Sequence, residues 1–284
     1  MKPQPYRGRQ VVLPTLHAKS QAIAPAFAER LGAQVVEHPC DTDRFGTFSG
    51  EVAREGTALD AARRKVAQAF ADTDAELALA SEGSFGPHPE TGFIPAGQEL
   101  LHFADRARDF ALTVSLTTAE TNYRMAEVDS LDALTEFAQR ARFPSHALIL
   151  ATGPRDARRR VLKGIRDETA LAQAFANLLR ESGETAVWVE TDMRASHNPT
   201  RMAAIAQLAQ TLATRLDTPC PACGLPGWGQ VDALTGLPCA WCGTPTRLVH
   251  SVVHGCVKCG HSERRERPDG RATADPGHCP ECNP

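Results

Sequence analysis

The feature that most constrains this chain is a group of cysteines near its C-terminal end, arranged as four Cys-x-x-Cys pairs. The ligand candidates are Cys220, Cys223, Cys239, Cys242, Cys256, Cys259, Cys279 and Cys282. Clustered pairs of this kind are typical of metal binding in a reducing compartment and not of a disulfide framework. Four thiolates complete a closed tetrahedral shell around Zn²⁺, so the tail predicts two structural zinc sites.

The spacing of the pairs allows two groupings. Fifteen residues separate the first pair from the second, and nineteen separate the third from the fourth. Both spacings match zinc ribbons, so consecutive pairing is preferred, while an interleaved, cross-braced module is the alternative. We expect a double zinc-ribbon domain over 217–284, in which metal binding supplies much of the folding energy.

The chain before the cysteines predicts an α/β domain over 1–216, with a mixed sheet flanked by helices. Val11–Leu13 reads as a strand, apolar residues between Ile23 and Leu31 recur at helical spacing, and Val35–Val36 begins a second strand. This strand-helix-strand opening is typical of α/β architecture. Further strands are expected over 77–80, 99–104, 110–116, 147–150 and 186–189, and helices over 57–71, 130–141, 167–183 and 198–215.

The strand at 77–80 is followed by Ser81–Pro89, which reads as a glycine- and proline-rich turn. Ligands bind at the carboxyl ends of strands in α/β sheets, and a carboxylate placed there can hold a divalent metal or act as a base. We therefore expect Glu82 to be catalytic. The other candidates for this role or for substrate contact lie in the turn after the first strand, in the polar loop after the second and beside Glu82: Thr15, His17, Lys19, Asp41, Asp43, Glu51 and Ser84.

A second group of ionisable residues follows the strand at 186–189. Asn198 is a good helix N-cap, and Pro199 suits the first helical position. Helix N-termini favour anions, so Arg194, His197, Asn198 and Arg201 are expected to bind substrate there. The arginine-rich stretch 152–166 reads as a solvated loop, with a lid over phosphates as the alternative.

Four stretches resemble an uncharacterised bacterial family: T-D-R-F-G-T-F at 42–48, S-E-G-S-F-G-P-H-P at 81–89, E-T-D-M-R-A-S-H-N-P-T-R-M at 190–202, and the cysteine tail. They span nearly the whole chain. Membership of this family implies no established activity.

The first 90 residues also resemble nucleoside triphosphate pyrophosphatases of the inosine and xanthosine triphosphatase type. The turn Thr15–Lys19 is similar to their T-x-N-x-x-K turn, 60–66 to their N-A-x-x-K-A helix, and 80–84 to their acidic G-I-E-G-G motif. Ser196-His197 resembles their S-H-R base-binding motif, but Asn198 replaces the arginine. The resemblance implies Mg²⁺-dependent release of pyrophosphate from a nucleotide.

Two functions follow from these patterns. In the first, the protein is a Mg²⁺-dependent hydrolase of a phosphorylated metabolite, with Glu82 and one of Asp41, Asp43 or Glu51 holding the metal, while Lys19 and Arg194 bind phosphate oxygens. In the second, it is a non-catalytic protein whose zinc ribbons contact nucleic acid or another protein.

The net charge of -3, the lack of a signal-like N-terminus and the lack of a long apolar run predict a soluble cytoplasmic protein without membrane contact.

Overall fold

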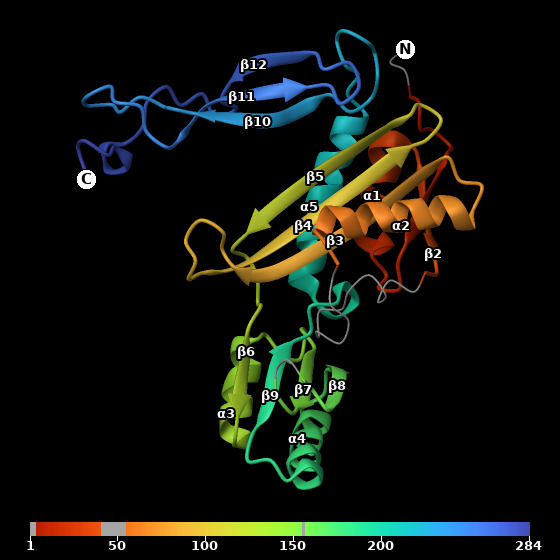
Figure 1. Cartoon of the computed structure of the whole chain (residues 1–284), viewed down its shortest axis with the longest axis vertical. Helices are drawn as coiled ribbons and strands as arrows, with labels where there is room; N and C mark the ends of the chain where they lie inside the picture. The colour runs from red at the N-terminus through yellow and green to blue at the C-terminus, as the bar shows by residue number, and fades with distance from the viewer. Residues whose placement is uncertain (1–3, 41–54, 155–156) are drawn as a thin grey trace. The chain divides into compact units, whose positions relative to one another are not determined.

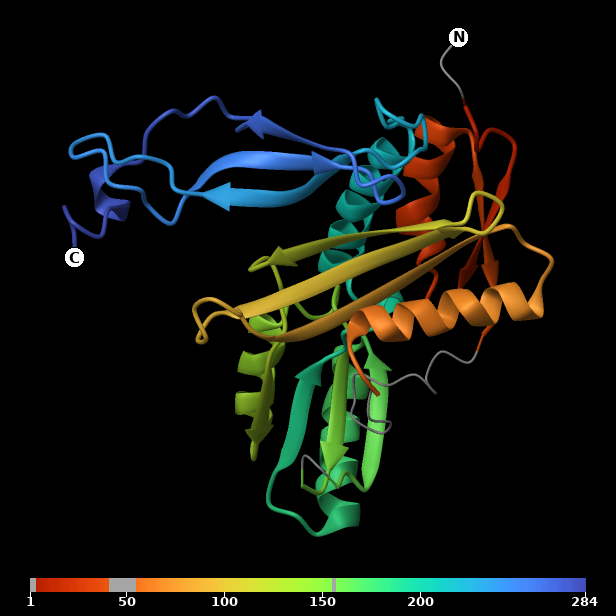
Figure 2. The same cartoon turned by 45° about the horizontal axis from the view of Figure 1, so that its top comes forward.

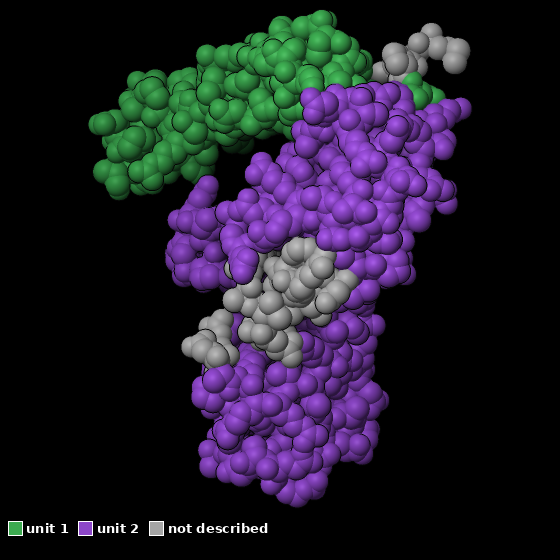
Figure 3. Space-filling view, turned by 45° about the vertical axis from the view of Figure 1, so that its right-hand side comes forward, with its two compact units in different colours: residues 1–4, 212–284 green, residues 5–211 purple. Residues whose placement is uncertain are grey.

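A computed structural model describes residues 4–40, 55–154 and 157–284. These residues divide into two compact units, one over 5–211 and the other built mainly from 212–284 (Figure 3). The first is a mixed α/β unit and the second carries the cysteine clusters, so the predicted fold class is confirmed. None of the helices in the described ranges combines the length and the apolar character needed to cross a bilayer.

The first sheet of the larger unit has the strand order β2-β1-β3-β4-β5 (Figure 1). Its strands are β1 (Gln10–Pro14), β2 (Gln34–His38), β3 (Leu77–Pro87), β4 (Pro95–Asp105) and β5 (Phe110–Thr118). β1 runs parallel to both β2 and β3, whereas β3, β4 and β5 form an antiparallel meander. The sheet is therefore parallel at one side and antiparallel at the other.

Helices α1 (Ser20–Leu31) and α2 (Ala58–Asp72) cover opposite faces of this sheet (Figures 1 and 2). α1 ends at Gly32, which has φ 62°, and α2 begins with a reciprocal capping box between Thr57 and Asp60. Small residues let α2 lie close to the strands, with Ala62, Val66 and Ala69 packed on Val12, Ala78 and Ala80. On the other face, Phe27 of α1 meets Phe103 of β4 with their ring centroids 6.5 Å apart.

The second sheet of the larger unit is fully antiparallel, with the order β6-β9-β7-β8. Its strands are β6 (Met125–Val128), β7 (Leu148–Thr152), β8 (Arg160–Ile165) and β9 (Val187–Thr191). Helices α3 (Leu131–Arg140) and α4 (Glu168–Ser182) bury their apolar stripes on it, and both start at side-chain N-caps, Ser130 and Asp167.

Two segments differ from the sequence-based expectation. The turn expected over 81–89 is mostly strand, because β3 continues to Pro87 and pairs without a break with β4. Glu82 consequently lies within a strand and not at its end. The solvated loop expected over 152–166 contains β8, whose residues pair with β7.

A buried ion pair ties the first sheet to helix α5 (Pro199–Leu216). Arg201 donates from Nε to Glu99 Oε1 at 2.5 Å and from Nη1 to the Met193 carbonyl at 2.5 Å. The pair fits because Gly83, directly across from Glu99 on β3, has no side chain. A Cβ there would lie 2.7 Å from Arg201 Nη2 and 2.8 Å from the Glu99 carboxylate oxygens.

The smaller unit contains a three-stranded antiparallel sheet in the order β10-β11-β12. Its strands are β10 (Gly229–Thr235), β11 (Val249–Gly255) and β12 (Ser262–Glu266). A short 3₁₀ turn over Pro276–His278 also belongs to this unit, and another over Ala195–His197 belongs to the larger unit. Trp228 packs against Cys220 and Cys256 in a small buried cluster.

Replacing Gly83 by Ala is expected to destabilise the larger unit by about 2–4 kcal/mol, because the new methyl group displaces a buried charge from its partner. Chemical unfolding followed by circular dichroism measures the change. Gly86→Ala is the matched control, since a Cβ at Gly86 of the same strand meets no atom within 4 Å. Equal stability of the two variants would contradict the structural role of the Glu99–Arg201 pair.

Candidate functional site

The order of the parallel strands creates a switch point between β1 and β3. From β1 the chain passes through α1 to β2 on one side, and then through α2 to β3 on the other side of β1. β1 and β3 share the register position Val12–Ala78, and β1 ends at Pro14, so β3 continues past the end of its neighbour. In open α/β sheets, ligands bind at the carboxyl ends of strands beside such a switch point.

Lys19 lies at this switch point. Its Nζ donates to the backbone carbonyl of Ser81 at 2.7 Å. The ammonium group thus binds a carbonyl of β3 that a longer β1 could have bound through its backbone. The residue is 6% exposed, and burial lowers the pKa of its ammonium to about 7, with the nearby charge of Arg201 acting in the same direction. Ala18 before it has φ 50°, a conformation that is unfavourable for a residue with a Cβ.

Lys65 reaches the same segment of β3 from the opposite face. It projects from the buried stripe of α2 and forms an ion pair with Glu82, and both side chains are less than 10% exposed. Among the described residues, the buried charges around Ser81 and Glu82 are Lys19, Lys65, Arg201, Glu82 and Glu99, which gives three cations and two carboxylates. Among these described groups the cationic side chains outnumber the carboxylates by one.

Several predicted site residues meet here and others do not. Lys19, Glu82 and Arg201 belong to one buried cluster, and Thr15 is buried in the adjoining turn, where its Oγ1 accepts from the backbone N–H of His17 at 3.1 Å. Ser84 lies farther along β3 and is half-buried. Asp41, Asp43 and Glu51 lie outside the described residues.

Sequence reasoning missed Lys65 and Glu99. Each carried a signal, because Lys65 occupies the apolar stripe of α2 between Ala61 and Ala69, and Glu99 has the same strand parity as the buried Leu101 and Phe103. A charged residue at an inward position of a helix or strand pattern indicates a buried ion pair or a ligand contact.

The start of α5, where the sequence predicts anion binding, has side-chain partners for two of its backbone N–H groups. Asn198 Oδ1 accepts from the N–H of Arg201 at 3.0 Å, and His146 Nε2 accepts from the N–H of Thr200 at 3.3 Å. Arg194 is bound to Asp192 at 2.6 Å, while Arg201 is bound to Glu99.

His197 lies beside Gly164 of β8, and burial lowers the pKa of its imidazole. Substrate contact by Arg194, His197, Asn198 and Arg201 stays a prediction. Three described arginines of the basic stretch are paired with carboxylates, in the pairs Arg158–Glu190, Arg159–Glu184 and Arg160–Glu181. These pairs offset the positive charge that a phosphate lid would need.

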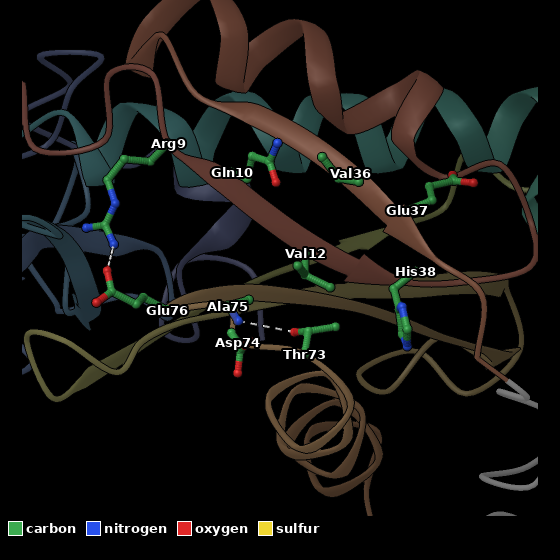
Figure 4. A pocket seen from close by; sticks show the side chains of 10 residues that line it. All are labelled: Arg9, Gln10, Val12, Val36, Glu37, His38, Thr73, Asp74, Ala75 and Glu76. Atoms are coloured by element: carbon green, nitrogen blue, oxygen red, sulfur yellow. Dashed lines mark hydrogen bonds and ion pairs between the residues drawn. The ribbon is translucent and has the colours of Figure 1, made fainter.

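A separate pocket of about 490 Å³ opens beside β1 and β2 and the connection from α2 to β3 (Figure 4). It is lined by Arg9, Gln10, Val12, Val36, Glu37, His38, Thr73, Asp74, Ala75 and Glu76. Of its charged groups, Arg9 pairs with Glu76, and His38 contacts Asp72, which is not among the lining residues. None of the residues predicted to bind substrate lines it.

The eight cysteines of the tail form two four-residue clusters, which are Cys220/Cys223/Cys256/Cys259 and Cys239/Cys242/Cys279/Cys282. Within each cluster the sulfur atoms lie within 4.8 Å of one another, an arrangement compatible with two structural zinc sites. The preferred consecutive pairing is therefore wrong, and the pairs interleave.

The sheet of the smaller unit explains the interleaving. β10 and β11 are antiparallel, so the pair before β10 and the pair after β11 meet at one end of the sheet, where Gly229 lies opposite Gly255. The pair after β10 and the pair that follows β12 are placed toward the other end. There the backbone of Cys239 forms an isolated β-bridge with Ala274, which precedes Cys279 by five residues in the sequence.

Comparison with protein-family models matches residues 65–284 to a family described as a domain of unknown function, DUF6671. A search of the curated proteins finds no match. These comparisons give no support to the resemblance to inosine triphosphatases, whereas the expected membership of an uncharacterised family agrees with the match. The match covers most of the chain, including β3, the α5 segment and both cysteine clusters, and the chain therefore belongs to the DUF6671 family.

Proposed function

We propose that the switch point between β1 and β3 binds the phosphate groups of a phosphorylated metabolite, such as a nucleotide, and that the protein hydrolyses this substrate with the help of Mg²⁺. The observation that carries the proposal is the convergence of two buried ammonium groups on one stretch of β3. Lys19 reaches it from the β1–α1 turn and Lys65 from α2, and both meet β3 at Ser81 and Glu82.

The energetics of burial favour an anionic ligand. Removing an ammonium from water costs several kcal/mol unless an opposite charge offsets it, and the described cluster holds more cations than carboxylates. A phosphate group would add negative charge beside these ammonium groups and would favour the protonated form of Lys19. Lys19 and Lys65 would act as point-charge donors to its oxygens.

Glu82 has the chemistry to hold Mg²⁺, which takes oxygen ligands and commonly binds through one or two carboxylates together with substrate phosphates. Glu99, the other described carboxylate of the cluster, is bound by Arg201, and Glu82 pairs with Lys65, which would hold the carboxylate in place beside the ion. The ion would neutralise phosphate charge and orient a water molecule. Lys19 and Lys65 would bind the phosphate, and Lys65 would also hold the Glu82 carboxylate in position.

Release of phosphate or pyrophosphate from a nucleotide panel that includes inosine and xanthosine triphosphates tests this proposal. We expect Mg²⁺-dependent turnover of at least one nucleotide, with kcat lowered about 100-fold or more in Glu82→Gln, which keeps the shape but loses the charge. Lys65→Met should raise KM, because an anion partner is lost. Glu90→Gln, at an exposed position in the β3–β4 connection, is the matched control.

The absence of turnover across the panel would contradict the hydrolase. Turnover that persists in Glu82→Gln would place the catalytic centre elsewhere.

The two cysteine clusters are proposed to hold one structural Zn²⁺ each. Every cluster is a closed set of four thiols that leaves no open position for a substrate, and each combines buried with more exposed sulfur atoms. Bound zinc would supply folding energy to a unit whose buried apolar side chains are few.

Two quadruple Cys→Ser variants distinguish the interleaved sites. Changing Cys220, Cys223, Cys256 and Cys259 removes one whole cluster, so about one zinc per chain should remain. Changing Cys220, Cys223, Cys239 and Cys242 removes half of each cluster, so no complete site should remain. Mass spectrometry of the purified variants measures their zinc content. If the second variant kept about one zinc and the first kept none, the pairing would be consecutive.

Contact with nucleic acid through the cysteine module is the weaker alternative. Arg265 pairs with Glu263 and Arg267 with Asp269, while Arg264 donates to Ser251 and contacts His250. These pairings offset the positive charge that phosphate backbones require. The exposed Trp241 is a feature of this module that a protein partner would bury.

A further inference from the structure

Ser81 carries a buried hydroxyl group that the fold does not use. Its side chain is 3% exposed, and Oγ has no hydrogen-bond partner among the residues that the structure describes. Leaving a buried donor unsatisfied destabilises the folded protein. Side chains alternate along a strand, so Ser81 faces the same side of β3 as Gly83, opposite to Ala80 and Glu82.

The position of Ser81 gives the hydroxyl a use. Its carbonyl oxygen accepts from Lys19 at 2.7 Å, and the next residue is Glu82, which pairs with Lys65. By covalent geometry, Oγ lies within a few ångströms of that carbonyl. The buried hydroxyl lies at a strand switch point, near a lysine ammonium. It can donate a hydrogen bond to an oxygen atom of a ligand bound there.

We propose that the Ser81 hydroxyl donates a hydrogen bond to a phosphoryl oxygen of the bound ligand. This inference rests on the proposed function and adds a residue to the site. Binding would draw the Lys19 ammonium from the Ser81 carbonyl toward the phosphate, and the phosphate would then reach Oγ. The hydrogen bond that forms on binding would offset the cost of the unsatisfied group in the free protein.

Calorimetric titration of the full-length protein with inorganic pyrophosphate and Mg²⁺ tests the proposal. Ser81→Ala is expected to weaken binding about tenfold or more, as the loss of a hydrogen bond to a charged group predicts. The melting temperature of free Ser81→Ala should equal or exceed that of the wild type, because an unsatisfied hydroxyl is removed. Ser115→Ala, an exposed serine on β5 of the same sheet, is the matched control.

Lys19→Met separates failure of the inference from failure of the proposed function. If Lys19→Met abolishes binding while Ser81→Ala binds like the wild type, the Ser81 contact is overturned and the phosphate site stands. If Ser81→Ala lowers the melting temperature without changing the affinity, the hydroxyl is structural. If the wild type binds no pyrophosphate, both the site and the Ser81 contact are overturned.

Discussion

The rest of the larger unit depends on one buried ion pair, between Glu99 of β4 and Arg201 of α5. A buried pair repays its desolvation cost only when its remaining donors and acceptors are also satisfied. Arg201 meets this condition, because it also donates to the Met193 carbonyl and lies over the Phe85 ring with its guanidinium 5.3 Å from the centroid. One side chain thereby fixes the start of α5, the turn after β9 and the middle of β3.

This pair also affects the candidate site. Arg201 donates hydrogen bonds to Glu99 and Met193, and its charge helps to lower the pKa of Lys19. In the proposed function, Lys19 and Lys65 would contact the phosphate. The candidate site therefore combines the end of the parallel strand β1 with the charged segment Ser81–Glu82 of β3, which pairs antiparallel with β4.

The local patterns of the sequence predict much of this fold. The capping box at Thr57 and Asp60, the stop at Gly32 and the N-cap at Asn198 are all present, because each depends on residues within one turn of the helix. The length of β3 was not predictable, since its glycines indicate a turn unless the cross-strand partners are known. Gly83 makes room for Arg201, which is 118 residues away in the sequence, and Gly97 lies under the ring of Phe85.

The same limit applies to the sites. Spacing alone identifies the eight cysteines, but their grouping depends on which ends of β10, β11 and β12 meet. Glu82 and Lys19 follow from the strand and turn patterns, whereas their relation to Lys65 and Glu99 depends on how α2 and β4 pack. Long-range pairing of charges thus decides the parts of the site that local patterns leave open.

The proposed function requires phosphate to bind where β1 ends beside β3. Amide chemical shifts of the isotope-labelled protein, followed during titration with pyrophosphate and Mg²⁺, report on this binding residue by residue. We expect the largest shift changes in the β1–α1 turn around Lys19 and from Ser81 to Gly83 of β3. Changes confined to the start of α5, to the pocket beside β2 or to the cysteine module would contradict it.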